Sequence, residues 1–157
     1  MPRSVAIAII HLVATAIMVG VIWYVQLVHY PLMAGWPHDA FGEWEAAHRL
    51  RTGWIVMPVM LVEGLAAAWL LAMRPAGVPA WLVAIGAVLL AAVWGSTFLV
   101  QVPCHETLAR GWDDAVHARL VASNWLRTVA WSLRLAVAVA VLTAGFEAFR
   151  TGLRRDR

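Results

Sequence analysis

The chain has 157 residues, of which 62% are hydrophobic and 13% are charged, and its formal net charge is +3. A soluble domain usually carries about 25% charged residues, so this composition excludes an ordinary soluble protein. Nucleic acid is excluded as a partner because the arginines flank apolar segments and form no basic stripe. The single cysteine, Cys104, excludes an internal disulfide.

Four apolar stretches are each long enough to cross a bilayer, which takes about 20 residues for a hydrocarbon core of about 30 Å. They cover residues 5–28, 54–73, 80–102 and 128–146. The first stretch is longer than the apolar region of a signal peptide, about 7–15 residues, so we expect it to remain as a span. The sequence therefore predicts a single transmembrane domain over residues 1–157, with the lipid bilayer as its main partner.

Four crossings place both termini on the same side of the membrane. Basic residues close to the spans set the orientation, whereas acidic residues contribute little. The densest group of arginines lies at residues 150–157. We therefore expect a multi-pass protein of the inner (plasma) membrane, with cytoplasmic termini and two long loops outside.

The two halves of the chain match each other when the sequence is shifted by 76 residues. His29 then falls on His105, and Leu50-Arg51-Thr52 falls on Leu126-Arg127-Thr128. Self-similarity of this kind is typical of repeated structural units, and coincidence in a chain rich in Trp and Arg is the alternative. Two copies, at residues 5–73 and 80–150, would enter the membrane in the same direction. The predicted fold is an all-α, integral membrane four-helix bundle built from two parallel helical-hairpin repeats.

The second and fourth helices are expected to extend beyond the membrane on the side of the long loops. Acidic residues at a helix start can cap free N–H groups and favour the positive end of the helix dipole. Asp39 and Asp113 precede patterns that continue into the membrane, with a possible kink at Pro58. We therefore predict long helices over Asp39–Met73 and Asp113–Arg150.

Polar side chains gather near the outer ends of the spans, where they are costly and are candidates for function. Neutral imidazole binds copper, iron and zinc, and bundles build metal sites from facing helices. We expect a transition metal, copper or iron, with haem as an alternative. In the structural alternative, which needs no metal, the histidines form hydrogen bonds to loop carbonyls and anchor the bundle. The candidate metal ligands are His29, His48, His105 and His117, and the residues that would orient them around the cofactor are Gln26, Gln101 and Asn124.

Two carboxylates and two arginines near the histidines are candidate catalytic residues. Glu45 lies one turn before His48 and Glu106 follows His105, so either could be a metal ligand or a general base. Arg51 and Arg127 could clamp an anionic substrate through bidentate hydrogen bonds. In the alternative, both arginines reach to the interface and pair with local acids.

Two charged residues lie within the spans themselves, and a histidine accompanies them. The depths of Glu63 and Arg134 differ by about 7–8 Å at a rise of about 1.5 Å per residue, which the long arginine side chain can bridge. We expect a structural ion pair between them. His11 should bond to a neighbouring helix, with haem ligation as the alternative.

The element Asn124-Trp125-Leu126-Arg127-Thr128, which leads into the last span, resembles the anthrone-oxygenase-like group of small four-span membrane proteins. That group carries an Asn-x-x-Arg element before its final helix. The resemblance implies oxidation of a small aromatic or quinone-like molecule, and it reaches only Asn124 and Arg127. The additional histidines depart from that pattern.

Two functions follow from these residues. The first is a membrane oxidoreductase that acts on a small lipophilic substrate at a histidine-lined site at the outer membrane–water boundary. The second is a non-enzymatic binding or transport module for a metal ion or a small anion, which would depend on Arg51 and Arg127. Because four spans are few for a transporter, the second function favours a homo-oligomer.

Overall fold

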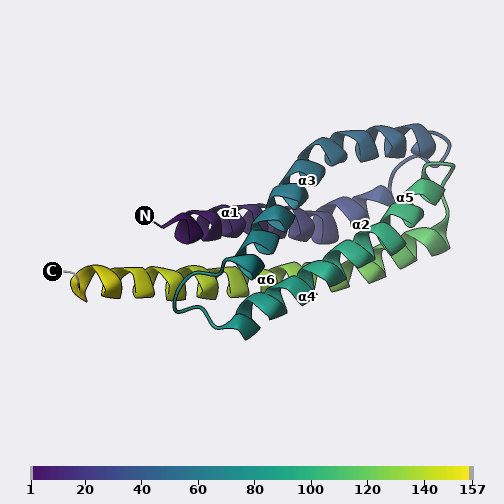
Figure 1. Cartoon of the computed structure of the whole chain (residues 1–157). Helices are drawn as coiled ribbons and strands as arrows, with labels where there is room; N and C mark the ends of the chain where they lie inside the picture. The colour runs from purple at the N-terminus through teal and green to yellow at the C-terminus, as the bar shows by residue number, and fades with distance from the viewer. Residues whose placement is uncertain (1, 156–157) are drawn as a thin grey trace.

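The computed structural model describes residues 2–155 as an all-α bundle of four long helical rods (Figure 1). The first rod joins α1 (Arg3–Tyr24), a π-helical segment η1 (Val25–His29) and α2 (Tyr30–Met33). The second rod is α3 (Phe41–Ala72). The third joins α4 (Ala80–Ser96), a second π-helical segment η2 (Thr97–Gln101) and α5 (Val102–Leu108), and the fourth is α6 (Asp114–Arg155).

Each of the four rods is long and apolar enough to cross a membrane, in agreement with the predicted number of spans. Both termini and the α3–α4 connection at residues 73–79 lie at one end of the bundle (Figure 1). The connections at residues 34–40 and 109–113 lie at the other end, which is called the long-loop end after the sequence prediction, although helix takes up most of the predicted long loops and neither connection is longer than the one at residues 73–79. The two long helices predicted over Asp39–Met73 and Asp113–Arg150 are found at Phe41–Ala72 and Asp114–Arg155.

The first and third rods each widen into a π-helical turn shortly before a proline. Pro31 follows η1 and Pro103 follows η2. A proline inside a helix has no N–H to donate, and its ring crowds the carbonyl four residues earlier. The wider turn accommodates the proline, so each helix continues for another turn or more. Such π-helical turns often occur at functional sites, and these two turns lie at the long-loop end.

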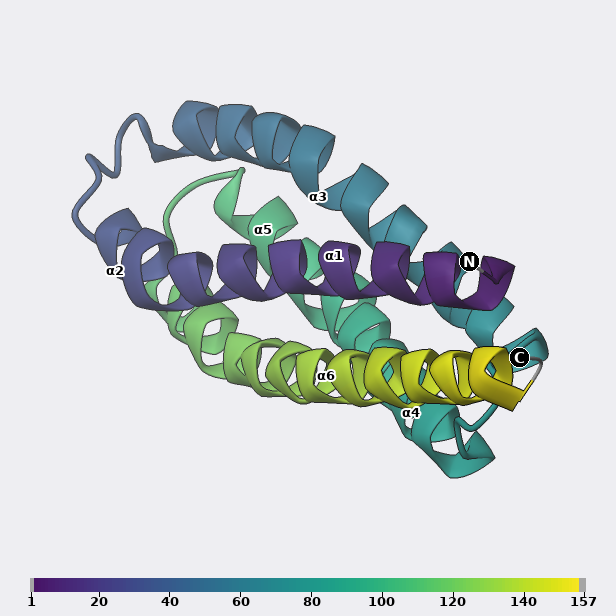
Figure 2. The same cartoon turned by 90° about the vertical axis from the view of Figure 1, so that its left-hand side faces the viewer.

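The fourth rod is the centre of the bundle. α6 packs closely along both α1 and α4. α3 packs closely along α1, but its contact with α4 is shorter. Figure 2 shows α1 and α6 side by side along most of their length, with α3 and α4 lying to either side of them. The seam between α3 and α4 is therefore the least closed of the packed seams.

The buried apolar side chains form three clusters that follow one another along the bundle. Because lipid is as apolar as these side chains, packing and polar contacts, more than the hydrophobic effect, define such an interior. The clusters contain, from the end with the termini to the long-loop end, Ala8, Leu70, Val78, Leu82, Val83 and Val141; then Met18, Ile22, Met60, Val93, Ala130 and Trp131; then Tyr30, Met33, Phe41, Cys104, Leu108 and Leu120.

A buried ion pair holds the middle of the bundle, and it confirms the predicted pairing of Glu63 with Arg134. The Nε and Nη2 atoms of Arg134 each lie 2.9 Å from Oε1 of Glu63. The other Glu63 oxygen accepts a hydrogen bond of 3.1 Å from the Trp131 indole, and Thr15 donates to Oε1 at 2.9 Å. His11 lies 3.1 Å from Arg134 through its Nε2 atom, so it bonds to a neighbouring helix as expected.

Candidate functional site

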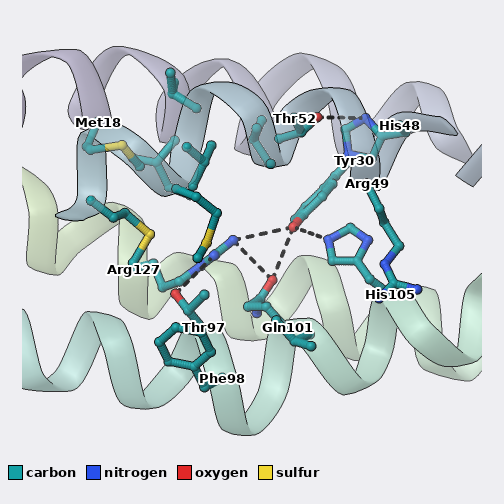
Figure 3. Close-up of a pocket in the computed structure, with 18 of the residues that line it drawn as sticks. Met18, Tyr30, His48, Arg49, Thr52, Thr97, Phe98, Gln101, His105 and Arg127 are labelled. Atoms are coloured by element: carbon teal, nitrogen blue, oxygen red, sulfur yellow. Dashed lines mark hydrogen bonds between the residues drawn. The ribbon is translucent and has the colours of Figure 1, made fainter. Parts of the chain in front are cut away.

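A large cavity lies toward the long-loop end of the bundle, between α1, α3, the third rod and α6 (Figure 3). Its volume is about 530 Å³. One part of its wall is apolar and the other part is polar, so the cavity is suited to a molecule that has both an apolar body and a polar group. The apolar part includes Met18, Ile22, Met57, Met60 and Trp131, and the polar part includes Tyr30, His48, Gln101, His105 and Arg127.

Arg127 is a buried cation in this wall, with 8% of its surface exposed. Its Nε donates to Oδ1 of Asn124 at 2.9 Å, and its Nη2 donates to Oε1 of Gln101 at 3.2 Å and to the Tyr30 hydroxyl at 3.4 Å. Its Nη1 lies 3.3 Å from the hydroxyl of Thr97. All of these partners are neutral, and no carboxylate between residues 2 and 155 lies within ion-pair distance of this guanidinium.

Tyr30 and His105 connect Arg127 to a buried carboxylate, and Gln101 bonds to both Tyr30 and Arg127. The Tyr30 hydroxyl lies 3.1 Å from Oε1 of Gln101 and 3.2 Å from Nε2 of His105. The other ring nitrogen of His105, Nδ1, lies 2.6 Å from Oε1 of Glu45, which is fully buried. The hydroxyl of Tyr30 has one proton, which it donates either to Gln101 or to Nε2 of a neutral His105 whose Nδ1 donates to Glu45. When the hydroxyl turns to His105, Tyr30 and His105 form a continuous hydrogen-bonded path, the relay, from the cavity wall to Glu45.

Three amide side chains fix the positions of the charged and relay groups. Asn124 accepts from Arg127 and donates to Oε1 of Gln26 at 2.7 Å. Gln101 accepts from both Arg127 and Tyr30, and its Nε2 donates to the hydroxyl of Ser123 at 2.8 Å. All three amides are buried; Asn124 and Gln101 contact the arginine, and Gln26 holds Asn124 in place.

His29 and His48 form a second group beside the relay. Their rings are stacked with centroids 4.1 Å apart, and the ring centroids of His48 and His105 are 6.0 Å apart. His48 Nδ1 lies 3.2 Å from the Thr52 hydroxyl. Within residues 2–155, Nε2 of His29 and Oε2 of Glu45 are buried and have no hydrogen-bond partner. Across the same residues, no three His, Cys, Asp or Glu side chains are arranged to hold a metal ion.

Of the predicted site residues, His48, Gln101, His105 and Arg127 line the cavity, and Gln26, His29, Glu45 and Asn124 contact these residues from behind the wall. The remaining three lie apart from this group. Nε2 of His117 lies 2.9 Å from the backbone oxygen of Tyr30, which matches the anchoring alternative for this histidine. Glu106 is exposed and pairs with Arg49 at 3.6 Å. Arg51 is also exposed. The structure thus brings together Gln26, His29, Glu45, His48, Gln101, His105, Asn124 and Arg127, and separates Arg51, Glu106 and His117 from them.

Tyr30 was not among the predicted site residues, although its hydroxyl lies between Arg127 and His105. Its one sequence signal is its place between His29 and Pro31, at the end of the first span. An aromatic residue at that place is also typical of a membrane-interface belt, so the pattern did not single it out.

Comparisons of the chain with protein-family models, with curated proteins and with solved structures found no match. The chain, with four helices long and apolar enough to cross a membrane, is therefore not assigned to a family.

Proposed function

We propose that the chain is a membrane oxidoreductase that acts on a small lipophilic aromatic or quinone-like molecule bound in the cavity. The observation that carries the proposal is the buried guanidinium of Arg127, which meets only neutral partners in the polar wall of an otherwise apolar cavity. Burying a charge costs several kcal/mol unless it is well compensated. A ligand oxygen is the partner that this geometry favours.

The cavity accommodates such a molecule in one orientation. Its volume of about 530 Å³ lies within the usual range for small-molecule sites, about 300–1,000 Å³. The aromatic body would pack against the buried side chains of Met18 and Met60, whose flexible thioethers adapt to flat rings. The oxygen would then face Arg127 and the Tyr30 hydroxyl, as Figure 3 shows for the directions of these side chains.

The relay removes a proton from the substrate without changing the net charge of the site. The substrate reacts from a form that carries a hydroxyl group, which for anthrone is the enol tautomer, and this hydroxyl gives its proton, through the Tyr30 hydroxyl, to Nε2 of His105. The resulting oxyanion pairs with Arg127, and the resulting imidazolium pairs with Glu45. Two ion pairs thus replace one separated pair of charges, and such preorganised stabilisation of a developing oxyanion is a large source of catalysis.

A deprotonated anthrone illustrates the oxidation that would follow. One anthrone and one dioxygen give one anthraquinone and one water: the ring carbon loses two hydrogens and gains one oxygen atom, and dioxygen is the oxidant. The resemblance of the element around Asn124 and Arg127 to the anthrone-oxygenase-like group supports this choice of substrate class.

In a second version of the proposal, the oxidation depends on a transition metal, copper or iron, as cofactor. His29, His48 and Glu45 would hold it after side-chain rotation, and the unpartnered Nε2 of His29 and Oε2 of Glu45 support these residues. The metal would supply a site that accepts electrons one at a time. Elemental analysis of purified protein, beside a His29→Ala variant, tests this form: stoichiometric metal that the variant loses supports it, and metal-free active protein overturns it.

We also propose how the chain is oriented in the membrane and that its two halves are repeats of one helical hairpin. We place both termini in the cytoplasm because of the arginines at residues 150–157. The π-helical turn before a proline in both the first and third rods supports a bundle built from two parallel hairpins. In this arrangement α3 and α6 extend beyond the membrane at the end where the cavity lies.

The function is tested with purified protein in liposomes that contain anthrone. Oxygen uptake and anthraquinone formation are followed for the native chain and for Arg127→Gln, with Arg51→Gln as the matched control from the other half. We expect oxidation that Arg127→Gln loses and Arg51→Gln keeps. Binding without oxidation would replace the enzyme with a binding module, and equal oxidation by all three proteins would contradict the assigned site.

A further inference from the structure

One side of the cavity is closed by polar contacts, and another side is open and lined by apolar side chains. Toward the loops, the seam between α3 and α5 is bridged by the ion pair of Arg49 with Glu106 and by the short contact of Glu45 with His105. These contacts join the second and third rods over the cavity and lie between its interior and the long-loop end.

The open side has an apolar rim. Leu50, Met57 and Phe98 line the cavity and are 59%, 56% and 47% exposed. A mouth that faced water would be expected to carry a polar rim, because exposed apolar groups gather where lipid or another apolar surface covers them. Met57 and Phe98 also lie within predicted spans, at residues 54–73 and 80–102.

An apolar groove continues from this mouth along the outside of the bundle. It has a volume of about 310 Å³ and shares Met57, Met60 and Phe98 with the cavity. Its wall also contains Trp94, which lies so close to Gly64 that a Cβ atom there would come within 2.9 Å of the Trp94 ring. Glycine at this position therefore lets the indole lie against α3.

The course of α3 explains why the seam is open here. Pro58 lies inside α3 and cannot donate to the carbonyl four residues earlier, which bends a helix. Figure 1 shows α3 changing direction partway along its length. The two rods are thus joined near the loops by polar contacts and diverge at the depth of Met57.

We propose that the lipophilic substrate enters the cavity sideways from the bilayer, between α3 and η2, past Leu50, Met57 and Phe98, and not from water past the Arg49–Glu106 pair. This inference rests on the proposed function for the identity of the substrate. The route itself depends only on the mouth and its surroundings.

The surroundings of the mouth are tested without a substrate. A nitroxide label is attached to Met57→Cys in a Cys104→Ala background, in liposomes, and its collisions with dissolved oxygen and with a water-soluble nickel chelate are compared. Exposed controls are Leu133→Cys within the fourth span and Ala115→Cys at the loop end of α6. We expect the label at position 57 to behave like that at 133. Behaviour like that at position 115 would overturn the lateral entrance, whether or not anthrone binds.

The route is tested by narrowing the mouth. Anthrone is delivered from liposomes to the native chain, to Met57→Trp and to Arg49→Gln, with Leu133→Trp as the control. We expect Met57→Trp to slow association by about tenfold while the dissociation constant stays within about twofold. Arg49→Gln and Leu133→Trp should leave the rate unchanged. An unchanged rate in Met57→Trp, or a faster rate in Arg49→Gln, would overturn the proposal. Absent binding by the native chain, with position 57 in lipid, would instead contradict the assigned substrate.

Discussion

Arg127 and Arg134 lie seven residues, about two helical turns, apart on α6, and both are almost completely buried, but their partners differ. Arg134 meets a carboxylate of its own chain, Glu63, at 2.9 Å. Arg127 meets only neutral groups, and a cavity lies beside it. A buried charge whose counter-ion is supplied by the chain stabilises the fold. A buried charge without an adjacent counter-ion indicates where a ligand binds.

Trp131 lies between the two arginines and separates their environments. Its indole N–H donates to Glu63 at 3.1 Å, while its ring lies 6.0 Å below the guanidinium of Arg127 and lines the cavity. The floor of the proposed site is therefore fixed by the structural ion pair. A change in the ion pair should affect the site through this ring, whereas a change at Arg127 should affect ligand binding more than the stability of the fold.

The largest expected effect is on stability, at the ion pair. Arg134→Met leaves Glu63 buried and uncompensated, so we expect a loss of about 3–5 kcal/mol in the free energy of unfolding. The double variant Glu63→Gln/Arg134→Met removes both charges and should lose much less. Denaturant unfolding in mixed micelles measures both variants. A double variant as unstable as Arg134→Met would show that the pair does not act as a unit.

Removal of the Tyr30 hydroxyl should lower the turnover rate of the enzyme. Tyr30→Phe keeps the ring but breaks the relay to His105, so we expect the rate of anthrone oxidation to fall about 100-fold. Affinity should change by no more than a few fold, because the Arg127 guanidinium remains. The measurement is kcat and KM from oxygen uptake. A rise in KM with an unchanged kcat would mean that the hydroxyl only binds the substrate.

Removal of the uncompensated cation should act on affinity more than on the fold. Arg127→Gln loses a charge-assisted hydrogen bond to the ligand, and we expect anthrone binding to weaken about 10- to 100-fold. The free energy of unfolding should fall less than in Arg134→Met, because no partner charge is left behind in contact with it. Equilibrium binding and micellar unfolding, made on the same samples, check both parts. Destabilisation as large as that of Arg134→Met would make Arg127 structural.

The smallest expected effect is at His117, which contacts the backbone of the site from outside. His117→Ala loses the hydrogen bond from Nε2 to the Tyr30 carbonyl, so we expect about 1 kcal/mol less stability. Anthrone binding should be nearly unchanged. Loss of bound metal in this variant would instead favour a ligand role for His117.

The sequence was sufficient for the four spans, the common end of both termini and the pairing of Glu63 with Arg134. These follow from the length of apolar runs and from the depth of charges along a helix, both of which are local quantities. The gathering of polar residues at the long-loop end was also predicted, because each residue lies near the same end of its span.

The different environments of Arg51 and Arg127 could not be predicted, although both occur in a Leu-Arg-Thr element. Arg127 lies where α6 packs against the other helices, whereas Arg51 lies on an exposed face of α3, and a local sequence match does not carry this difference. The relay through Tyr30 was hidden for another reason. The π-helical turn before Pro31 changes the angle between successive side chains, so helical spacing does not give the face on which Tyr30 lies.

The most direct test of the account is the absorption spectrum of anthrone bound to the native protein and to Arg127→Gln, recorded without oxygen. Deprotonated anthrone absorbs at longer wavelength than the neutral ketone. The account predicts that the native chain binds the coloured oxyanion and that Arg127→Gln binds the neutral form weakly. Neutral anthrone bound equally by both proteins would contradict an oxyanion site at Arg127.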